Sequence, residues 1–255
     1  MPADSHYDKV DKQFGPRAQA YIDSPTHAAG EDIEALAVLM AGKRPHLAID
    51  LGAGGGHVAY RMAGLADHVL AVDLSQDMLL AVGATARARG ITNLTTLCAP
   101  AEMMSLPDEH ADFLASRYSA HHWHDLAAGL REAHRVLKPG ATAVFMDTAA
   151  PRSAVVDTHL QAIELLRDRS HVRNYTAAEW VSALAVAGFQ VQTLSHHPLR
   201  LEFQPWVKRS GTPIAMVAAL LELQSGASQP VRDALRIEDD GTFTVDKVFI
   251  TATRT

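Results

Sequence analysis

The sequence predicts an α/β fold in which helices cover both faces of a doubly wound, mostly parallel sheet. Between Leu47 and Thr148, short runs rich in β-branched and apolar residues alternate with longer runs of helical periodicity. A cluster of glycines directly behind the first apolar run is the second observation. Such alternation is typical of strand–helix–strand units with right-handed crossovers, which bring the carboxyl ends of the strands to one edge. Ligands of such sheets bind at that edge.

The elements are expected in the following order. Strands are expected at 46–50, 68–74, 93–99, 111–119 and 141–147. Helices are expected between them at 57–66, 76–90 and 125–140, the last two ending at the stop signals Gly90 and Pro139-Gly140. Further helices are expected at 33–42, 153–169, 177–189 and 213–226. The alternating run 242–254 predicts a strand, and 189–203 predicts one long strand or a strand pair.

Composition and charge favour a globular protein that binds a small molecule. The chain has 255 residues, 47% of them hydrophobic and 20% charged, and a net charge of −6. This balance lacks the basic footprint that follows a phosphate backbone, so we do not expect nucleic acid as a partner. We expect a single domain over 1–255: a helical cap at 1–45, a cofactor-binding core at 46–150, and substrate-side helices with the last two strands at 151–255.

Location and assembly follow from similar arguments. No apolar run approaches the roughly 18 residues that span a bilayer, and the start lacks the basic-then-apolar order of a signal peptide, so we expect a cytoplasmic protein. Cys98 is the single cysteine, which excludes an intramolecular disulfide, and we expect it to be a buried structural thiol. The apolar run 213–223 would suit either a homodimer interface or a pocket lid.

The glycine-rich turn is the strongest local signal. Glycine permits positive φ and lets a ligand approach without meeting a Cβ atom, and the following helix presents free N–H groups. Gly54, Gly56 and Ala59 satisfy a loose dinucleotide pattern, G-x-G-x-x-A, but this frame starts late after the strand. Read from Asp50, the same residues with Gly52 give D-x-G-x-G-x-G. The two frames imply different cofactors.

The second frame resembles the first motif of class I methyltransferases that use S-adenosylmethionine. The segments at 69–79, 98–125 and 130–147 resemble later motifs of the small-molecule group that includes the quinone-biosynthesis enzymes. "QFGPRAQAY" at 13–21 and "HVRNYTAAEW" at 171–180 are similar to segments of methyltransferases of this kind. The resemblance implies a Rossmann-like sheet of seven strands, mostly parallel, with an antiparallel last strand near 243–251. It also implies S-adenosylmethionine as cofactor and S-adenosylhomocysteine as product.

The resemblance also implies roles for residues at the carboxyl ends of the strands. The glycines approach the methionine and ribose, Asp50 orients the loop and the amino group, and Asp73 binds the ribose. Residues 101–102 flank the adenine, and 117–118 supply backbone facing the sulfonium. Pro100 stands where the family often has an acid that contacts the adenine amino group. The expected cofactor-binding set is Asp50, Gly52, Ala53, Gly54, Gly56, Asp73, Leu74, Met78, Ala101, Glu102, Arg117 and Tyr118.

Histidines follow the fourth strand in "SAHHWHD". His121 and His122 are candidates for a general base, because a histidine near neutral pH can accept a proton from the attacking group. The alternative is that they pack or hydrogen-bond structurally. Adjacent histidines point in different directions and no carboxylate or cysteine pattern completes a zinc set, so no metal site is expected. Methyl transfer needs mainly in-line positioning and exclusion of water, which makes a base optional.

The acceptor pocket is expected between the two ends of the chain. The expected substrate-binding residues are Phe14, Arg17, Tyr21, His171, Arg173, Tyr175, Trp206 and Arg209. Core packing is the alternative for the aromatic residues, and a solvated surface for the arginines. We hypothesise that Arg173 or Arg209 pairs with a substrate carboxylate or enolate.

The favoured function is transfer of a methyl group from S-adenosylmethionine to an oxygen, nitrogen or carbon atom of a small molecule. One alternative is an NAD(P)-dependent oxidoreductase, which the late glycine frame and the lack of a Tyr-x-x-x-Lys pair disfavour. Another is a non-catalytic protein that binds S-adenosylmethionine, because an intact binding motif does not by itself establish turnover.

Overall fold

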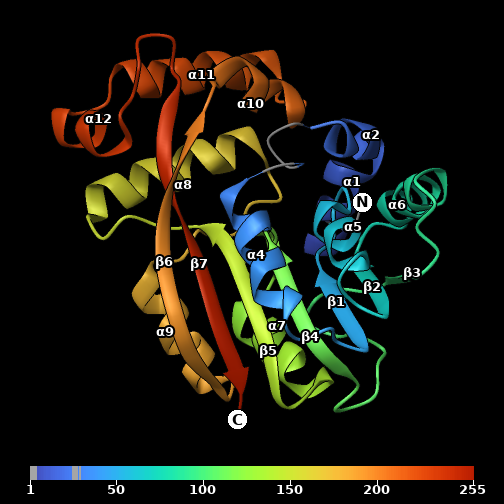
Figure 1. Cartoon of the computed structure of the whole chain (residues 1–255). Helices are drawn as coiled ribbons and strands as arrows, with labels where there is room; N and C mark the ends of the chain where they lie inside the picture. The colour runs from blue at the N-terminus through green and yellow to red at the C-terminus, as the bar shows by residue number, and fades with distance from the viewer. Residues whose placement is uncertain (1–4, 25–27, 29) are drawn as a thin grey trace.

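The computed structural model describes residues 5–24, 28 and 30–255 (Figure 1). Within the cap expected at 1–45, residues 1–4, 25–27 and 29 lie outside the described part. The chain begins with α1 (His6–Phe14), η1 (Gly15–Arg17) and α2 (Ala18–Ile22). Ser5 caps α1 by accepting a hydrogen bond from the Asp8 N–H, and the Asp8 carboxylate accepts one from the Ser5 N–H in return.

Seven strands form one sheet in the order β3-β2-β1-β4-β5-β7-β6. The strands are β1 (Leu47–Leu51), β2 (His68–Asp73), β3 (Leu94–Cys98), β4 (Ala111–Arg117), β5 (Leu137–Thr148), β6 (Phe189–Leu201) and β7 (Phe243–Arg254). β7 is antiparallel to both of its neighbours, β5 and β6, whereas the pairs among the first five strands are parallel. The predicted fold class is therefore confirmed, including the antiparallel last strand.

Helices cover both faces of this sheet. One face packs against α4 (Glu31–Ala41), α5 (His57–Ala63) and α6 (Gln76–Ala88), and the other against α7 (Leu126–Val136) and α9 (Ala177–Val186). Within β1, Ala48 belongs to the apolar core under α4, α5 and α6. Leu47, Ile49 and Leu51 belong to the core under α7 and α9. Both faces of a central parallel strand are buried, which explains its continuous apolar run.

The remaining helices lie beyond the carboxyl ends of the parallel strands. α8 (Ala154–Arg167), α10 (Phe203–Arg209), α11 (Ile214–Ser225) and α12 (Gln229–Leu235) gather there, at the top of Figure 1. They share a third apolar core with the ends of β6 and β7, through Leu201, Phe243 and Val245. The C-terminal half of the chain thus roofs the edge at which ligands of such sheets bind.

Three local expectations need correction or refinement. The helix expected to end at Pro139-Gly140 ends at Val136, and β5 begins at Leu137. Lys138 precedes a proline, which disfavours helical backbone there. The segment expected at 189–203 forms one long strand, β6, which has a bulge near Val191 and ends at Leu201, before α10 begins at Phe203. Cys98 was expected to be buried but is exposed, at the end of edge strand β3, where only one neighbouring strand covers it.

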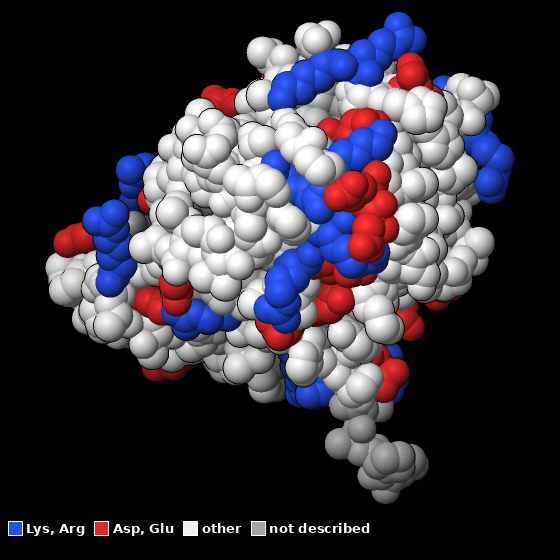
Figure 2. Space-filling model, turned by 90° about the horizontal axis from the view of Figure 1, so that it is seen from below, with Lys and Arg blue, Asp and Glu red and all other residues white. Residues whose placement is uncertain are grey.

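The opposite edge of the sheet, where the parallel strands begin, carries mixed charge. Figure 2 shows this face from below, with blue and red side chains next to one another. Ion pairs at strand beginnings and ends include Arg44–Asp67 (3.2 Å) and Lys138–Asp112 (2.7 Å). Among the described helices, none is long and apolar enough to cross a membrane.

Candidate active site

The glycine turn between β1 and α5 is built from left-handed backbone. Gly52, Gly54 and Gly56 have φ values of 72°, 48° and 76°. A Cβ atom on Gly52 would lie 1.8 Å from the Ser119 Oγ, so this position cannot carry a side chain without rearrangement. At Gly54 nothing lies within 4 Å of a Cβ position, so the backbone faces open space. A ligand can therefore lie directly against this turn.

Two carboxylates hold the turn in place. Asp73, at the end of β2, accepts hydrogen bonds from the Gly54 N–H (2.8 Å) and the Ser75 N–H (2.9 Å). Asp50 accepts one from the Ala59 N–H (2.8 Å) in the first turn of α5. Burial raises the pKa of both acids, that of Asp50 to about 7. A cationic ligand group beside Asp50 would favour its ionised form.

A pocket enclosing about 930 Å³ opens above this turn. The predicted cofactor-binding residues among its lining are Asp50, Gly52, Ala53, Gly54, Asp73, Leu74, Met78, Ala101, Glu102, Arg117 and Tyr118. Gly56 is not part of the lining; it precedes the first residue of α5, and a Cβ there would lie 2.8 Å from the Tyr60 ring. The structure thus brings eleven of the twelve residues of this predicted set together around one cavity, which we call the first pocket.

The lining of the first pocket also includes Pro100, directly before Ala101 and Glu102. Glu102 is held from two directions: its carboxylate accepts a hydrogen bond from the Asp125 N–H (3.2 Å) and one from the Tyr7 hydroxyl. Tyr7 belongs to α1, so the N-terminal helix reaches the same end of the pocket.

At the end of β4, Arg117 directs its guanidinium toward α4. Its Nε donates to Asp32 Oδ2 at 2.6 Å, and Lys247 of β7 lies 3.0 Å from the same carboxylate. The guanidinium also lies over the Tyr118 ring, 4.5 Å from its centroid. Tyr118 has a φ of +52°, an uncommon value for a large side chain. The buried Asp32 thus anchors the β4 terminus at the edge of the pocket.

A second pocket, of about 550 Å³, adjoins the first. Phe14, Tyr21, Tyr118 and His122 line both pockets. The rest of the second lining consists of His121, Thr148, Glu164, Arg167, Asp168, Leu199, Leu201, Trp206 and Arg209. Of the predicted substrate-binding residues, it therefore contains Phe14, Tyr21, Trp206 and Arg209.

The other four predicted substrate-binding residues are absent from the lining of both pockets. Arg17 donates to the Gln13 carbonyl (2.5 Å), and the Tyr175 ring lies 6.3 Å from that of Trp180. Arg173 pairs with Asp157 at 3.2 Å and with Glu179 at 3.4 Å, so protein carboxylates already neutralise its charge.

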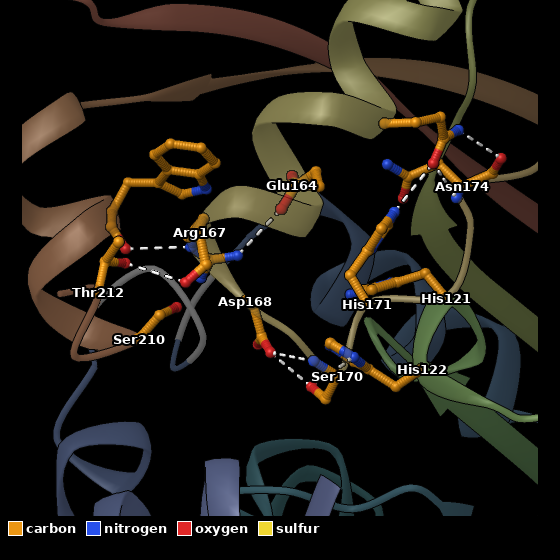
Figure 3. Close-up of polar contacts among 12 residues, drawn as sticks. His121, His122, Glu164, Arg167, Asp168, Ser170, His171, Asn174, Ser210 and Thr212 are labelled. Carbon is orange, nitrogen blue, oxygen red and sulfur yellow. Dashed lines mark hydrogen bonds and ion pairs between the residues drawn. The ribbon is translucent and has the colours of Figure 1, made fainter. Parts of the chain in front are cut away.

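The two candidate bases, whose rings are labelled beside that of His171 in Figure 3, have opposite electrostatic surroundings. Burial alone would lower the pKa of His121, but Asp147, whose Oδ1 lies 2.5 Å from His121 Nδ1, outweighs burial and raises it. Burial and the neighbouring His121 lower the pKa of His122 to about 3. His122 Nδ1 lies 3.2 Å from the Ser170 Oγ, which donates to Asp168 at 2.6 Å. His121, with the raised pKa, is thus the stronger base of the two, and His122, with the lowered pKa, is neutral near pH 7.

His171 lies behind these two rings, 5.7 Å from that of His121. Its Nε2 contacts the Gln161 Oε1 at 2.9 Å, and burial together with the other histidines lowers its pKa to about 2. In the part of the chain that the structure describes, no group of three or more histidine, cysteine, aspartate or glutamate side chains is arranged to hold a metal ion.

Helices α8 and α10 supply the cations of the second pocket. Arg167 pairs with Glu164 at 3.1 Å, and its guanidinium lies over the Trp206 ring, 4.9 Å from the centroid. Arg209 differs: its buried Nε has no hydrogen-bond partner, and no ion pair joins it to any described carboxylate. Burial and the nearby Arg167 lower the pKa of Arg209.

Sequence reasoning missed several residues of the second pocket. Asp147 ends an apolar strand, which is the signal that identified Asp73, and the same rule would have found it. Glu164, Arg167 and Asp168 gave no such signal, because charged residues near the end of an amphipathic helix are usually solvated. Only the packing of α8 over the strand ends turns them toward a cavity.

Comparison with known proteins agrees with this architecture. Residues 49–145 match the family described as "Methyltransferase domain". The chain belongs to this family and is an S-adenosylmethionine-dependent methyltransferase.

Three proteins illustrate the relationship. The uncharacterized protein YafE of Escherichia coli (strain K12) is 45% identical over 184 residues, 72% of this chain and 89% of that protein. The uncharacterized methyltransferase YcgJ of Bacillus subtilis (strain 168) is 30% identical over 224 residues, 88% of each chain. The crystal structure of YcgJ superposes with a TM-score of 0.84 at 26% identity, covering 88% of this chain and 97% of that one. A demethylmenaquinone methyltransferase of Chlorobaculum tepidum is 34% identical over 118 residues, 46% of this chain and 47% of that protein.

Proposed function

We propose that this enzyme transfers a methyl group from S-adenosylmethionine in the first pocket to a small molecule in the second. The observation that carries the proposal is that the two pockets adjoin, because Phe14, Tyr21, Tyr118 and His122 line both of them. Ligands bound in adjoining pockets can meet without exposing the reacting atoms to water, which is what methyl transfer requires of a protein.

The first pocket fits S-adenosylmethionine in its chemistry. Asp50 is a buried carboxylate suited to an ammonium group, and Asp73 is a half-buried one suited to ribose hydroxyls. When bound, S-adenosylmethionine would supply an electrophilic methyl group on a sulfonium that leaves readily.

His121 is the proposed general base. Because its Nδ1–H is held by Asp147, its Nε2 is the atom left to accept a proton from the attacking group of the acceptor. Asp147 keeps the ring in this tautomer and stabilises the imidazolium that forms. Neutral His122 lines both pockets, and its ring packs on that of Phe14 with 4.9 Å between the ring centroids.

A compact, soluble acceptor is proposed in preference to a nucleic acid or a lipid surface. The second pocket is a concave site lined by aromatic and aliphatic side chains with a few charged groups, as small-molecule sites are. The net charge of −6 and the mixed charge in Figure 2 give little attraction for a polyanion. The cytoplasmic location and the homodimer stay predictions from the sequence.

Calorimetric titration with S-adenosylhomocysteine, S-adenosylmethionine and NADH tests the cofactor. We expect the two sulfur nucleotides to bind in the micromolar range, about −8 kcal/mol, and NADH not to bind. Asp73→Ala should weaken binding by at least about 100-fold, because hydrogen bonds to a charged group contribute about 1.5–3 kcal/mol each. Asp67→Ala, in an exposed acid before β2, is the matched control and should bind normally.

Each other outcome has a distinct meaning. Binding of NADH alone would support the oxidoreductase alternative and contradict the proposal. Cofactor binding without methyl transfer to any member of a broad acceptor panel would favour the non-catalytic alternative.

A further inference from the structure

Arg209 differs from three other arginines that are fully or partly withdrawn from solvent. Arg117 pairs with Asp32, Arg135 with Glu132 and Asp108, and Arg167 with Glu164. Arg209 lies at the end of α10 in the second pocket, and among the described residues none pairs with it. A guanidinium that is largely removed from water without a counter-ion is costly. A ligand that brings the counter-ion would relieve this cost.

None of the described acids of the second pocket forms an ion pair with Arg209. Glu164 pairs with Arg167 (Figure 3), and Asp147, which holds His121, also accepts a hydrogen bond from its neighbouring backbone N–H. Asp168 accepts hydrogen bonds from the Ser170 N–H and Oγ and forms no ion pair with Arg209. Arg209 is therefore the arginine of this lining that has no ion-pair partner among the described residues, and the Asp168 Oδ2 is likewise buried without a hydrogen-bond partner.

The walls around Arg209 indicate the shape of the ligand. Trp206, Tyr21 and Phe14 supply aromatic surface, and Leu199 and Leu201 supply aliphatic surface. Flat apolar walls with one fixed cation suit a planar body that carries a single anionic group. Arginine binds carboxylates in a bidentate manner, which also fixes their orientation.

We propose, on the basis of the methyltransferase function argued above, that the acceptor is a planar carboxylic acid whose carboxylate binds Arg209. Arg209 lines the second pocket but not the first, so the carboxylate is held away from the methyl donor. It serves as a handle, and a different atom of the acceptor, on the side of His121, receives the methyl group. The acceptor's own carboxylate is therefore retained in the product.

Benzoate and benzamide provide a matched pair of probes, because they share a planar ring and differ in charge. We would measure their binding to the protein by ligand-observed NMR, with and without S-adenosylhomocysteine. The wild-type protein should bind benzoate at least about ten-fold more tightly than benzamide. Arg209→Gln should remove this preference, and Arg209→Lys should retain part of it. Lys208→Gln changes an exposed cation next in sequence and should leave the preference intact.

Three results would overturn the proposal. They are equal binding of the two probes, a preference that survives in a folded Arg209→Gln protein, and no benzoate binding at millimolar concentration. A thermal melt of each variant identifies loss of folding, and Arg209→Lys then decides the question. Failure of S-adenosylhomocysteine to bind while benzoate is still preferred would instead count against the proposed methyl transfer, so the two failures are distinguishable.

Discussion

The two pockets are constructed in different ways. The first is built largely from backbone and from residues that follow strand ends in contiguous motifs, such as the glycine turn after β1 and Asp73 after β2. The second is built from side chains on α8 and α10, on β6, and on the loop after β4. Binding of a shared cofactor therefore depends on short stretches of sequence, whereas recognition of the acceptor depends on how distant elements pack.

The two pockets also differ in the charges that they present to a ligand. The first pocket presents carboxylates whose pKa is raised by burial, so it favours a ligand with positive charge. The second has the Arg167–Glu164 ion pair, together with Arg209 and Asp168, which form no ion pair with each other. If the comparison is right, substitutions in one pocket should leave the function of the other nearly intact.

The largest expected effect of this kind concerns the second pocket. Asp147→Asn should lower kcat about 100-fold for any acceptor that needs deprotonation, because His121 loses the group that orients it. Asp147 raises the pKa of His121, so the acid limb of the rate profile should move to lower pH in the variant. Affinity for S-adenosylhomocysteine should be unchanged. An unshifted pH profile would exclude His121 as the base.

A smaller effect is expected from the glycine turn. Gly52→Ala should weaken S-adenosylhomocysteine binding by about ten-fold or more and lower Tm, because alanine is strained at the Gly52 φ of 72° and its Cβ would clash with Ser119. Gly83→Ala is the control: its Cβ would meet only Arg87, at 3.5 Å, inside α6. It should stabilise the protein by about 0.5–1 kcal/mol. Equal effects of the two substitutions would mean that the turn is not a close-contact surface.

The smallest effect is a proton count. Burial raises the pKa of Asp50 to about 7, so the free enzyme is partly protonated there at neutral pH. A bound ammonium group would lower this pKa, and less than one proton should be released on cofactor binding near pH 7. Calorimetry in buffers of different ionisation heat measures the release. It should disappear about two pH units higher, where Asp50 is already ionised, and in Asp50→Asn. Proton uptake would contradict the role given to Asp50.

The sequence predicted the first pocket better than the second for a physical reason. Glycine spacing and an acid at a strand end mark local backbone geometry, so Gly52, Gly54 and Asp73 could be identified without knowledge of the fold. Arg173 and Arg209 could not be distinguished, since both are cations in short segments that also contain an aromatic residue. The structure separates them by their partners: Asp157 and Glu179 neutralise Arg173, while Arg209 lies in the cavity.

By itself, the sequence determined the class of fold, the edge of the sheet that carries the site and the glycine turn. These depend on periodicity and on backbone conformation, which neighbouring residues largely fix. Only the tertiary structure decided that Asp147 holds His121, that Arg117 is tied to Asp32, and that Arg209 is left without a partner. Such pairings join residues tens of positions apart, and the packing of α4, α8 and α10 over the sheet creates them.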